Sequence, residues 1–339
     1  MTQFLNRRRF LRRAGLAGLG LAAGGLSMPY VARAAATQIA IATNPGLENR
    51  TLNTLMAQLG YLKDFGADTR IVDAPGATGP FDTIAAGAAD LCMVSGYNMI
   101  LPRIEQGAPL KIVCAGMRKT ALTVFARPEG IRTLSDLRGK TVAVGGDMGL
   151  LHALILQLLK EKGIAATEVT FIDKGSNDNC YKAVVAGEVD ACCSSISHLN
   201  DADGLVVVPE GNMWQSLPGY TFQAGYASIT AIGAKHEGLV AVMAAYGALY
   251  DYLMTPASHD AFIEARKAAQ KDFDAASGEA IWQFNRDQRP YTRDLTIDDA
   301  AINYLQDMFV GLGSLQRKHP VSEVADMTAA REAARLVTP

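Results

Sequence analysis

The sequence predicts an α/β protein that uses one strand–helix unit twice, once in each of two lobes, and then continues as a helical tail. Strands and helices alternate from about residue 37 to residue 197. The segments "TIAAGAADLCMVS" (83–95) and "AVVAGEVDACCSS" (183–195) share one pattern, in which a helix ends at a glycine and an Asp leads into a buried strand. After residue 235 only helical patterns follow. We therefore expect mainly parallel sheets.

The front of the chain supplies the first unit. Apolar residues recur at helical spacing in 50–66, and Gly87 ends a second, shorter helix. We expect strands at 37–43, 69–74, 90–95 and 110–117, and helices at 50–66, 79–87 and 97–107.

The second unit repeats this order. We expect strands at 122–129, 140–144, 169–174 and 190–195, with helices at 150–162 and from residue 176. The tail follows with helices at 239–254, 258–273, 277–287 and 297–315. Since no long linker interrupts the chain, short crossing segments should join the two units. We place these crossings near Leu122–Ala126 and Phe222–Ile229.

Residues 1–34 have the three parts of a secretory signal: a basic start, an apolar middle and a small-residue exit. Arg7-Arg8 precede Arg9-Phe10-Leu11 and a further arginine, which indicates a twin-arginine signal. An ordinary signal with a rich basic region is the alternative. No cysteine stands at the exit, which disfavours a lipoprotein. We expect a periplasmic protein whose mature chain starts at Ala35.

The net charge and the length of the chain limit its possible functions. The signal holds six arginines and no acid, so the mature chain has 26 basic and 34 acidic residues, a net charge of about −8. An acidic surface without a basic stripe or an aromatic platform excludes nucleic acid as a partner. The 305 residues that remain are enough for two lobes with separate cores. We expect a monomer.

The five cysteines form no C-x-x-C motif. We expect most of them to be small buried hydrophobes, although a disulfide between Cys180 and Cys192 or Cys193 stays open in an oxidising compartment.

The sequence lacks the motifs of common enzymes. There is no G-x-S-x-G, and the five histidines form no H-E-x-x-H or other metal pair. Asp201–Asp203 lacks the other oxygens of a calcium loop. We expect no catalytic residue, no metal and no cofactor.

The glycine-rich stretch 139–149 resembles a nucleotide loop only superficially. Lys140-Thr141 precede the strand, and Leu134 stands where a P-loop needs its first glycine. The G-x-G-x-x-G spacing also fails. A helix that starts here presents free N–H groups, which suit an anion or a polar acceptor. Asp147 either caps this helix or faces a cleft.

Five segments carry a family resemblance: "GYLKDFG", "IAAGAADLCMVS", "IEQGAPLKIVCA", "GIRTLSDLRGKTVAV" and "VVAGEVDACC". Together they resemble the solute-binding proteins of ABC importers, in the sulfonate, taurine and nitrate group that also contains thiamine-pyrimidine-precursor binders. The resemblance implies a two-lobed periplasmic-binding-protein fold of type II with two hinge crossings. Lobe I would hold residues 35–123 and 224–339, and lobe II residues 124–223. A small-molecule ligand, a permease and its ATPase would be the partners.

The resemblance places the ligand between the lobes, at strand ends and helix starts. The residues of this sequence at those places are Thr43, Asn44, Gly76, Thr78, Ser95, Tyr97, Asn98, Asp147, Met148, Gly149, His152, Ser194, Ser195 and Tyr226. For each of these residues the alternative is a purely structural role, in helix capping or in packing.

Two departures put the ligand in doubt. No arginine stands at a strand end to clamp a sulfonate, and Asp147 would repel an anion unless it turns away. Three ligand classes therefore remain as alternatives: a sulfonate, an aromatic acid and a pyrimidine-like solute. We expect a binding protein that performs no chemistry. The alternatives are an enzyme on the same fold, such as a thiamine-pyrimidine or menaquinone-pathway enzyme, and a ligand-sensing module for a membrane receptor.

Overall fold

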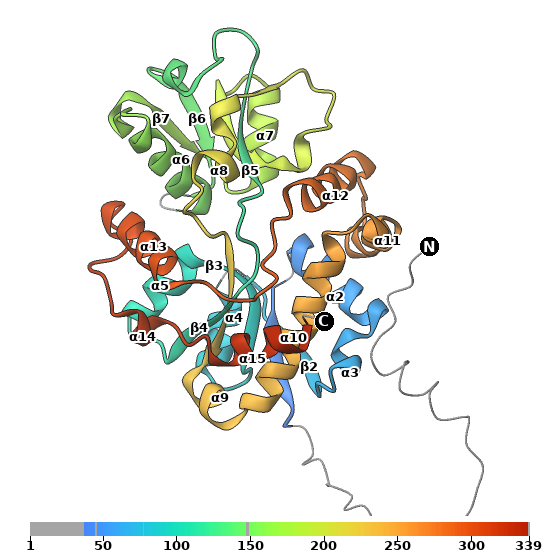
Figure 1. Ribbon diagram of the computed structural model, residues 1–339. Coiled ribbons are helices and arrows are strands. Elements are labelled where there is room, and N and C mark those ends of the chain that lie inside the picture. Colours follow the sequence, from blue (N-terminus) through green and yellow to red (C-terminus); the bar gives the residue numbers. More distant parts are fainter. Residues whose placement is uncertain (1–36, 45, 77, 147–148, 338–339) are drawn as a thin grey trace, which may run out of the picture. The chain divides into compact units, whose positions relative to one another are not determined.

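The computed structural model describes residues 37–337 except 45, 77, 147 and 148. The expected signal in residues 1–34 lies outside the described residues. The strands form two separate five-stranded sheets, each covered by helices (Figure 1).

The first sheet has the strand order β2-β1-β3-β10-β4. Its strands are β1 (Ile39–Thr43), β2 (Thr69–Asp73), β3 (Leu91–Gly96), β4 (Leu110–Ala115) and β10 (Gln223–Ser228). The first three pair in parallel, and β10 runs antiparallel between β3 and β4.

The second sheet repeats this plan in the order β7-β6-β8-β5-β9. Its strands are β5 (Leu122–Ala126), β6 (Thr141–Val144), β7 (Thr170–Asp173), β8 (Ala191–Ser195) and β9 (Val206–Val207). Here β5 is the antiparallel strand, between β8 and β9. The expectation of mainly parallel sheets therefore needs one amendment, because each sheet takes in one strand of the opposite direction.

The repeated Gly-acid-x-Asp pattern has the same structural role in both sheets. Asp90 Oδ2 accepts a hydrogen bond of 2.8 Å from the N–H of Ala40 in β1. Asp190 Oδ2 accepts one of 2.9 Å from the N–H of Thr141 in β6. Each carboxylate thus pairs with a strand N–H that the ladder would leave free, and it sets the neighbouring strand in register.

Helices cover the sheets and form the tail. In the first unit they are α2 (Leu47–Leu59), α3 (Tyr61–Asp64), α4 (Gly79–Ala85) and α5 (Tyr97–Glu105), and in the second α6 (Leu150–Glu161), α7 (Asn177–Val185) and α8 (Met213–Ser216). The tail holds α9 (Ile229–Ala234), α10 (His236–Leu253), α11 (His259–Ala269), α12 (Ala275–Gln288), α13 (Asp299–Gly311), α14 (Val321–Val324) and α15 (Thr328–Val337). Short 3-10 turns lie at Leu134–Leu137, Ala166–Glu168, Ile196–His198, Pro209–Gly211 and Pro256–Ser258.

Most of the tail packs on the first sheet, but α12 does not. Helix α10 packs against β1, α2 and α15, and α11 packs against α2. Helix α12 instead contacts the turn Ile196–His198 that follows β8, and its Phe284 ring meets Trp214 of α8 edge-on at 5.2 Å. The chain therefore returns to the second sheet a second time, which the sequence did not indicate.

Three segments consequently connect the two sheets. The first, residues 116–121, runs from β4 to β5, and the second, residues 217–222, runs from α8 to β10. The residues expected to cross, Leu122–Ala126 and Phe222–Ile229, mostly form β5 and β10, so the connections lie just ahead of them. The third, residues 289–298, follows α12.

Backbone hydrogen bonds tie these segments together. The Met117 carbonyl oxygen accepts from the N–H groups of Phe222 at 3.0 Å and Gln223 at 2.9 Å. On the other side, Arg118 N donates to the Pro290 oxygen at 2.7 Å, and Thr292 N to the Gly116 oxygen at 2.8 Å. The short stretch 116–118 is thus bound to both other connections.

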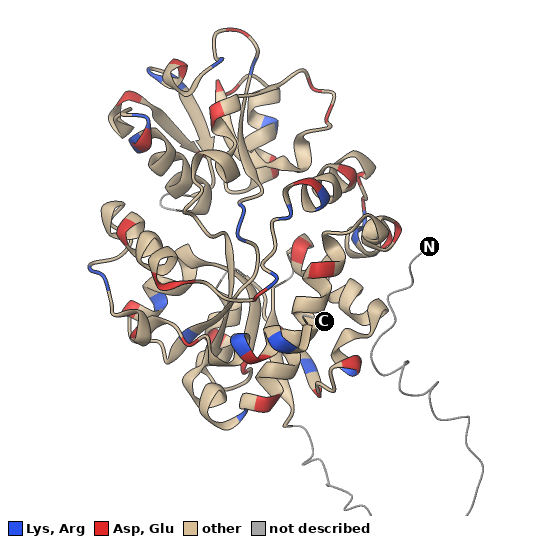
Figure 2. Ribbon diagram, in the orientation of Figure 1, with Lys and Arg blue, Asp and Glu red and all other residues tan. Residues whose placement is uncertain are grey.

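Basic residues also lie on the connections. Arg118 pairs with Asp294 at 2.9 Å, and Lys119 Nζ donates to the Gln288 carbonyl oxygen at 2.6 Å. Elsewhere the described elements carry acidic and basic residues interspersed, without a continuous basic stripe (Figure 2).

Among the described residues, no single helix is long and apolar enough to cross a bilayer; His236–Leu253 and Pro256–Ala269 pass such a test only as a pair bent by 100°.

Candidate functional site

A cavity of about 600 Å³ lies between the two sheets, and we call it the cleft pocket. Its floor is apolar and comes from the connections and the strand that follows: Met117, Ala121, Leu122 and Phe222. Its walls come from the start of α2, from the turn after β8 with the start of α7, and from α11 and α12. A solute in it would therefore touch both units and the connections between them.

The wall from the second unit is built on two element starts. Ser176 caps α7, because its side chain accepts from the N–H of Asn179 at 3.2 Å. This leaves Asn177 in the first turn, where its buried Oδ1 has no hydrogen-bond partner among the described residues. Ser195 ends β8, and its Oγ accepts from the N–H of Ser197 at 3.1 Å.

His198 stands between two carboxylates on this wall. Its Nδ1 lies 2.7 Å from Asp201 Oδ2, and its Nε2 lies 3.3 Å from Asp178 Oδ1. The ring stacks on Tyr181 at 4.0 Å between ring centres. Burial by itself lowers the pKa of His198, but the hydrogen bonds and charges of Asp178 and Asp201 outweigh burial and raise this pKa above its ordinary 6.5. The same contact lowers the pKa of Asp178.

The opposite wall carries a buried charge that was not among the predicted site residues. Arg266 of α11 is 5% exposed, and its Nη1 lies 3.7 Å from Glu48 Oε2. Its Nε has no hydrogen-bond partner among the described residues. Glu48 Oε1 also accepts a hydrogen bond of 3.0 Å from the Tyr291 hydroxyl.

Asn285 of α12 also lines the cleft pocket. It is 0% exposed, and within the described part of the chain neither its Oδ1 nor its Nδ2 has a partner. Buried amides in folded proteins are usually hydrogen-bonded, so an amide with both atoms unpaired at the edge of a cavity indicates a site that a ligand completes.

Of the predicted site residues that the structure describes, Ser195 lines the cleft pocket. Three others are fully buried, Tyr97 at the start of α5, Ser194 in β8 and Tyr226 in β10. Tyr97 and Tyr226 are 0% exposed, with Tyr226 stacked on Phe81 at 4.5 Å, and the Oγ of Ser194 donates to the Asn177 carbonyl oxygen at 2.8 Å.

The remaining predicted residues lie at the strand ends. Thr43 Oγ1 accepts from Asn53 at 3.1 Å, and Asn44 Oδ1 accepts from the N–H of Gly46 at 2.9 Å. Ser95 and Asn98 lie half-buried where β3 meets α5. Gly76 is exposed, and Thr78 precedes α4.

The glycine-rich stretch has a structural tie of its own. Asp173 Oδ1 accepts from the N–H groups of Gly146 at 2.9 Å and Gly175 at 2.8 Å. Gly149 precedes α6, and the His152 ring packs against Phe171 at 4.6 Å. Asp147 and Met148 lie outside the described residues, so the role of Asp147 stays a prediction.

Arg266 and Asn285 come from tail helices in which no site residue was predicted. One signal was available for Arg266. It follows Phe262 by four residues and Ala265 by one, so it lies on the buried face of α11, where a charge needs a reason. No comparable signal marks Asn285, because its place depends on the return of α12 to the second sheet.

All five cysteines are buried and free, as most were expected to be, and the disulfide that was left open is not formed. Burial raises the pKa of Cys92 and of Cys180 to about 11 and that of Cys114 to about 12. Within the described residues, no group of three or more His, Cys, Asp or Glu side chains could hold a metal ion.

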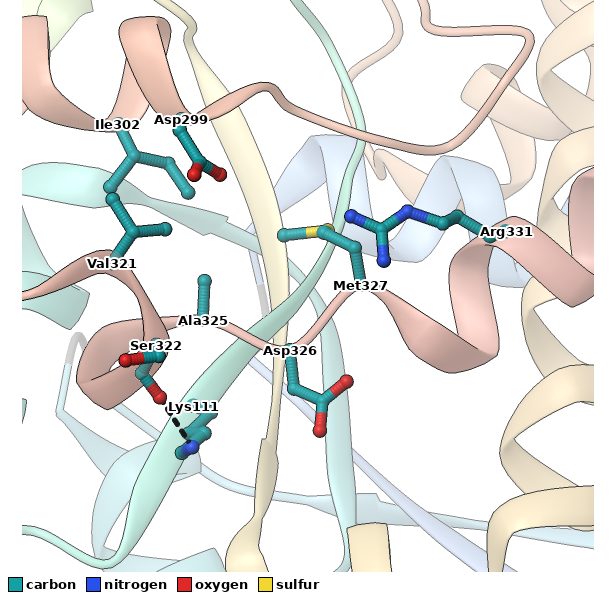
Figure 3. A pocket seen from close by; sticks show the side chains of 9 residues that line it. All are labelled: Lys111, Asp299, Ile302, Val321, Ser322, Ala325, Asp326, Met327 and Arg331. Atoms are coloured by element: carbon teal, nitrogen blue, oxygen red, sulfur yellow. Dashed lines mark hydrogen bonds between the residues drawn. The ribbon is translucent and has the colours of Figure 1, made fainter.

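A further cavity of about 370 Å³ lies away from the cleft pocket, between β4, α13, α14 and α15. Lys111 lines it next to Ser322, and its Nζ donates to the Ser322 carbonyl oxygen at 2.6 Å (Figure 3). This bond closes the gap between β4 and α14, so we assign the cavity to packing between elements.

The His198 cluster predicts a pH-dependent stability. Because the pKa of His198 is higher in the folded than in the unfolded protein, protonated His198 stabilises the folded state fully below pH 6.5. This stabilisation is lost as the pH rises through the pKa of His198 in the folded protein. Urea unfolding over a pH series should therefore show a free energy of unfolding that falls above about pH 6.5, and His198→Gln should lack this component. His236→Gln is the control, since His236 pairs with Glu332 away from the pocket. An identical fall in His198→Gln and the unmodified protein would contradict the assignment.

Comparison with known protein families supplies independent evidence on the family of this chain. A family model described as "NMT1/THI5 like" matches residues 51–281, more than half of the chain. No curated protein sequence matches the chain.

Solved structures share the fold at low sequence identity. The alkanesulfonate-binding protein SsuA from Xanthomonas axonopodis, bound to MOPS, is 20% identical over 86% of this chain and 98% of that one, with a TM-score of 0.67. The periplasmic aliphatic sulphonate-binding protein SsuA from Escherichia coli is 18% identical over 86% and 92%, with a TM-score of 0.70. A DSZB mutant in complex with biphenyl-2-sulfinic acid is 12% identical over 88% and 99%, with a TM-score of 0.65.

These structures confirm the fold that the family resemblance predicts. The observed strand order, in two mixed five-stranded sheets, belongs to this fold. The matched family model runs from within α2 to within α12 and so includes every strand of both sheets except β1. The chain belongs to the NMT1/THI5-like family and has the periplasmic-binding-protein fold.

Proposed function

We propose that the chain is the solute-binding component of an ABC import system. The observation that carries this proposal is the cleft pocket, which is large enough for a small organic solute and is lined from both units and their connections. Family membership supports it, and so do the structures of the same fold, which include sulfonate-binding proteins and a ligand-binding component of an ABC-type import system.

The architecture supports capture by closure of one lobe on the other. We take lobe I as residues 35–123 and 224–339 and lobe II as residues 124–223, with α12 reaching from the first across to the second. A ligand that touches both walls gains its full contacts only in the closed state, so binding shifts the population towards that state. A permease and its ATPase would then accept the closed, loaded form.

We also propose that the protein works in the periplasm and is exported by the twin-arginine route. The support is Arg7-Arg8 ahead of Arg9-Phe10-Leu11 and the A-x-A exit at residues 32–34. Replacing Arg7 and Arg8 together by lysine should leave the precursor in the cytoplasm, as immunoblots of cell fractions would show. Mature protein in the periplasmic fraction of this variant would rule out the route.

An enzyme on the same fold is the main alternative, and two observations count against the reactive corner that Cys192, Cys193 and His198 would form. Both cysteines are 0% exposed, and burial raises the pKa of each thiol. Both ring nitrogens of His198 face carboxylates, so neither is placed to take a proton from a nucleophile.

The test of the proposed function is a binding screen on residues 35–339 with sulfonates, nitrate, aromatic acids and pyrimidines. Calorimetry should show one solute bound per chain, without turnover. Thermal unfolding should shift upward, because a ligand at 100 times its Kd adds about 2.7 kcal/mol to the free energy of unfolding. Chemical conversion of a bound solute, or no binding by any class, would contradict the proposal.

A further inference from the structure

We propose that the cleft pocket selects a neutral or zwitterionic solute that presents N–H donors next to oxygen acceptors, as amides, ureides and amino acids do. This inference rests on the proposed function and narrows its ligand. It starts from polar side chains of the pocket lining with buried atoms that lack a hydrogen-bond partner among the described residues: Asn177, Arg266 and Asn285. A further such atom, Nε2 of His198, faces the Asp178 carboxylate at 3.3 Å.

Two of the unpaired groups are donors. The Nε–H of Arg266 and the Nδ2 amide of Asn285 find no acceptor among the described residues. They come from adjacent tail helices, and Arg266 is paired only loosely, at 3.7 Å from Glu48. A carbonyl or carboxylate oxygen of a ligand would supply the acceptor that both lack.

Two further unpaired groups are acceptors. They are the Oδ1 atoms of Asn177, in the first turn of α7, and of Asn285, in α12. Each requires a donor, and a ligand without N–H or O–H groups leaves both unpaired. A simple sulfonate or carboxylate has acceptor oxygens only, so burying it here would keep the desolvation cost of both amide oxygens. A ligand with N–H groups removes that cost.

The charge balance of the pocket agrees with this selection. Among the described lining residues, the carboxylates are Glu48, Asp178, Asp201 and Asp274, and the basic side chains are Lys182, His198 and Arg266. With His198 protonated, the lining carries no positive excess to attract an anion. Arg266 and His198 are moreover already neutralised by neighbouring carboxylates. A neutral or zwitterionic solute enters such a pocket without net repulsion from either sign of charge.

The first test compares head groups on one body. Two series differ only in the head group: propionamide, propionate and propane-1-sulfonate, and benzamide, benzoate and benzenesulfonate; β-alanine adds the zwitterion. Calorimetry and thermal shift on residues 35–339 should show at least tenfold tighter binding of an amide or of β-alanine than of the matched carboxylate and sulfonate. Equal or tighter binding of the simple anions would overturn this inference and leave the proposed function standing. No binding by any probe of this panel or of the earlier screen would overturn both.

The second test removes the unpaired amide. Asn285→Leu should weaken binding of the tightest amide probe at least tenfold while the melting temperature of the ligand-free protein holds or rises, since an unpartnered buried amide is gone. Gln306→Leu is the matched control. Gln306 is equally buried, but its amide is paired with the His319 backbone at 2.8 and 3.1 Å, away from the pocket. It should lower the melting temperature and keep the affinity.

Asn285→Asp is a second variant that keeps the size of the side chain and replaces the N–H donor by an acceptor, and its melting temperature shows whether the buried carboxyl group leaves the protein folded. It should also weaken binding of the amide probe at least tenfold. Unchanged affinity in both Asn285 variants would overturn the assignment.

Discussion

The structure depends on a short stretch of backbone, Gly116–Arg118, that is hydrogen-bonded on both sides. Its carbonyl and N–H groups pair with residues 222 and 223 on one side and with residues 290 and 292 on the other. Three chain segments that are far apart in the sequence are thereby held together where they pass between the sheets. Because β5 and β10 each lie next to such a connection, each enters its sheet antiparallel to its neighbours. The apolar floor of the cleft pocket, with Met117 and Phe222, comes from the same place.

Much of the fold could be predicted because its determinants are local. The glycine stop followed by an Asp recurs in both halves, and Asp90 and Asp190 both bond to the N–H of a neighbouring strand. The third connection could not be predicted in this way. Arg289 and Leu295 adopt left-handed backbone angles, with φ of 46° and 56°, without the glycine that would mark such a turn. The two-residue strand β9 is too short to show a period.

The fold is confirmed, whereas the predicted ligand contacts stay a prediction, and the rule behind them could not find every residue of the cleft pocket. The rule that ligands bind at strand ends directed attention to residues such as Tyr97 and Tyr226, which are fully buried. It cannot locate side chains contributed by helices far along the chain. Arg266 and Asn285 reach the pocket because α11 packs on α2 and α12 packs beside the turn after β8. Those contacts are set by tertiary packing, which leaves little trace in a single sequence.

The pocket also illustrates the opposition between stability and binding. A buried arginine with an unpaired Nε and a buried asparagine with two unpaired atoms each cost folding free energy, on the order of 1–3 kcal/mol per unsatisfied group. A well-packed core would replace them with apolar side chains. Both side chains line one cavity, and a ligand that pairs with them would remove this cost in folding free energy. The same atoms would then destabilise the ligand-free protein and stabilise the complex.

The most direct test of this account is a crystal structure of residues 35–339 with the tightest solute from the binding screens. The account predicts the solute in the cleft pocket, in contact with Asn177 or Asn285 and, on the opposite wall, with Arg266 of α11. A solute bound to one wall alone, or in the cavity beside Lys111, would contradict it.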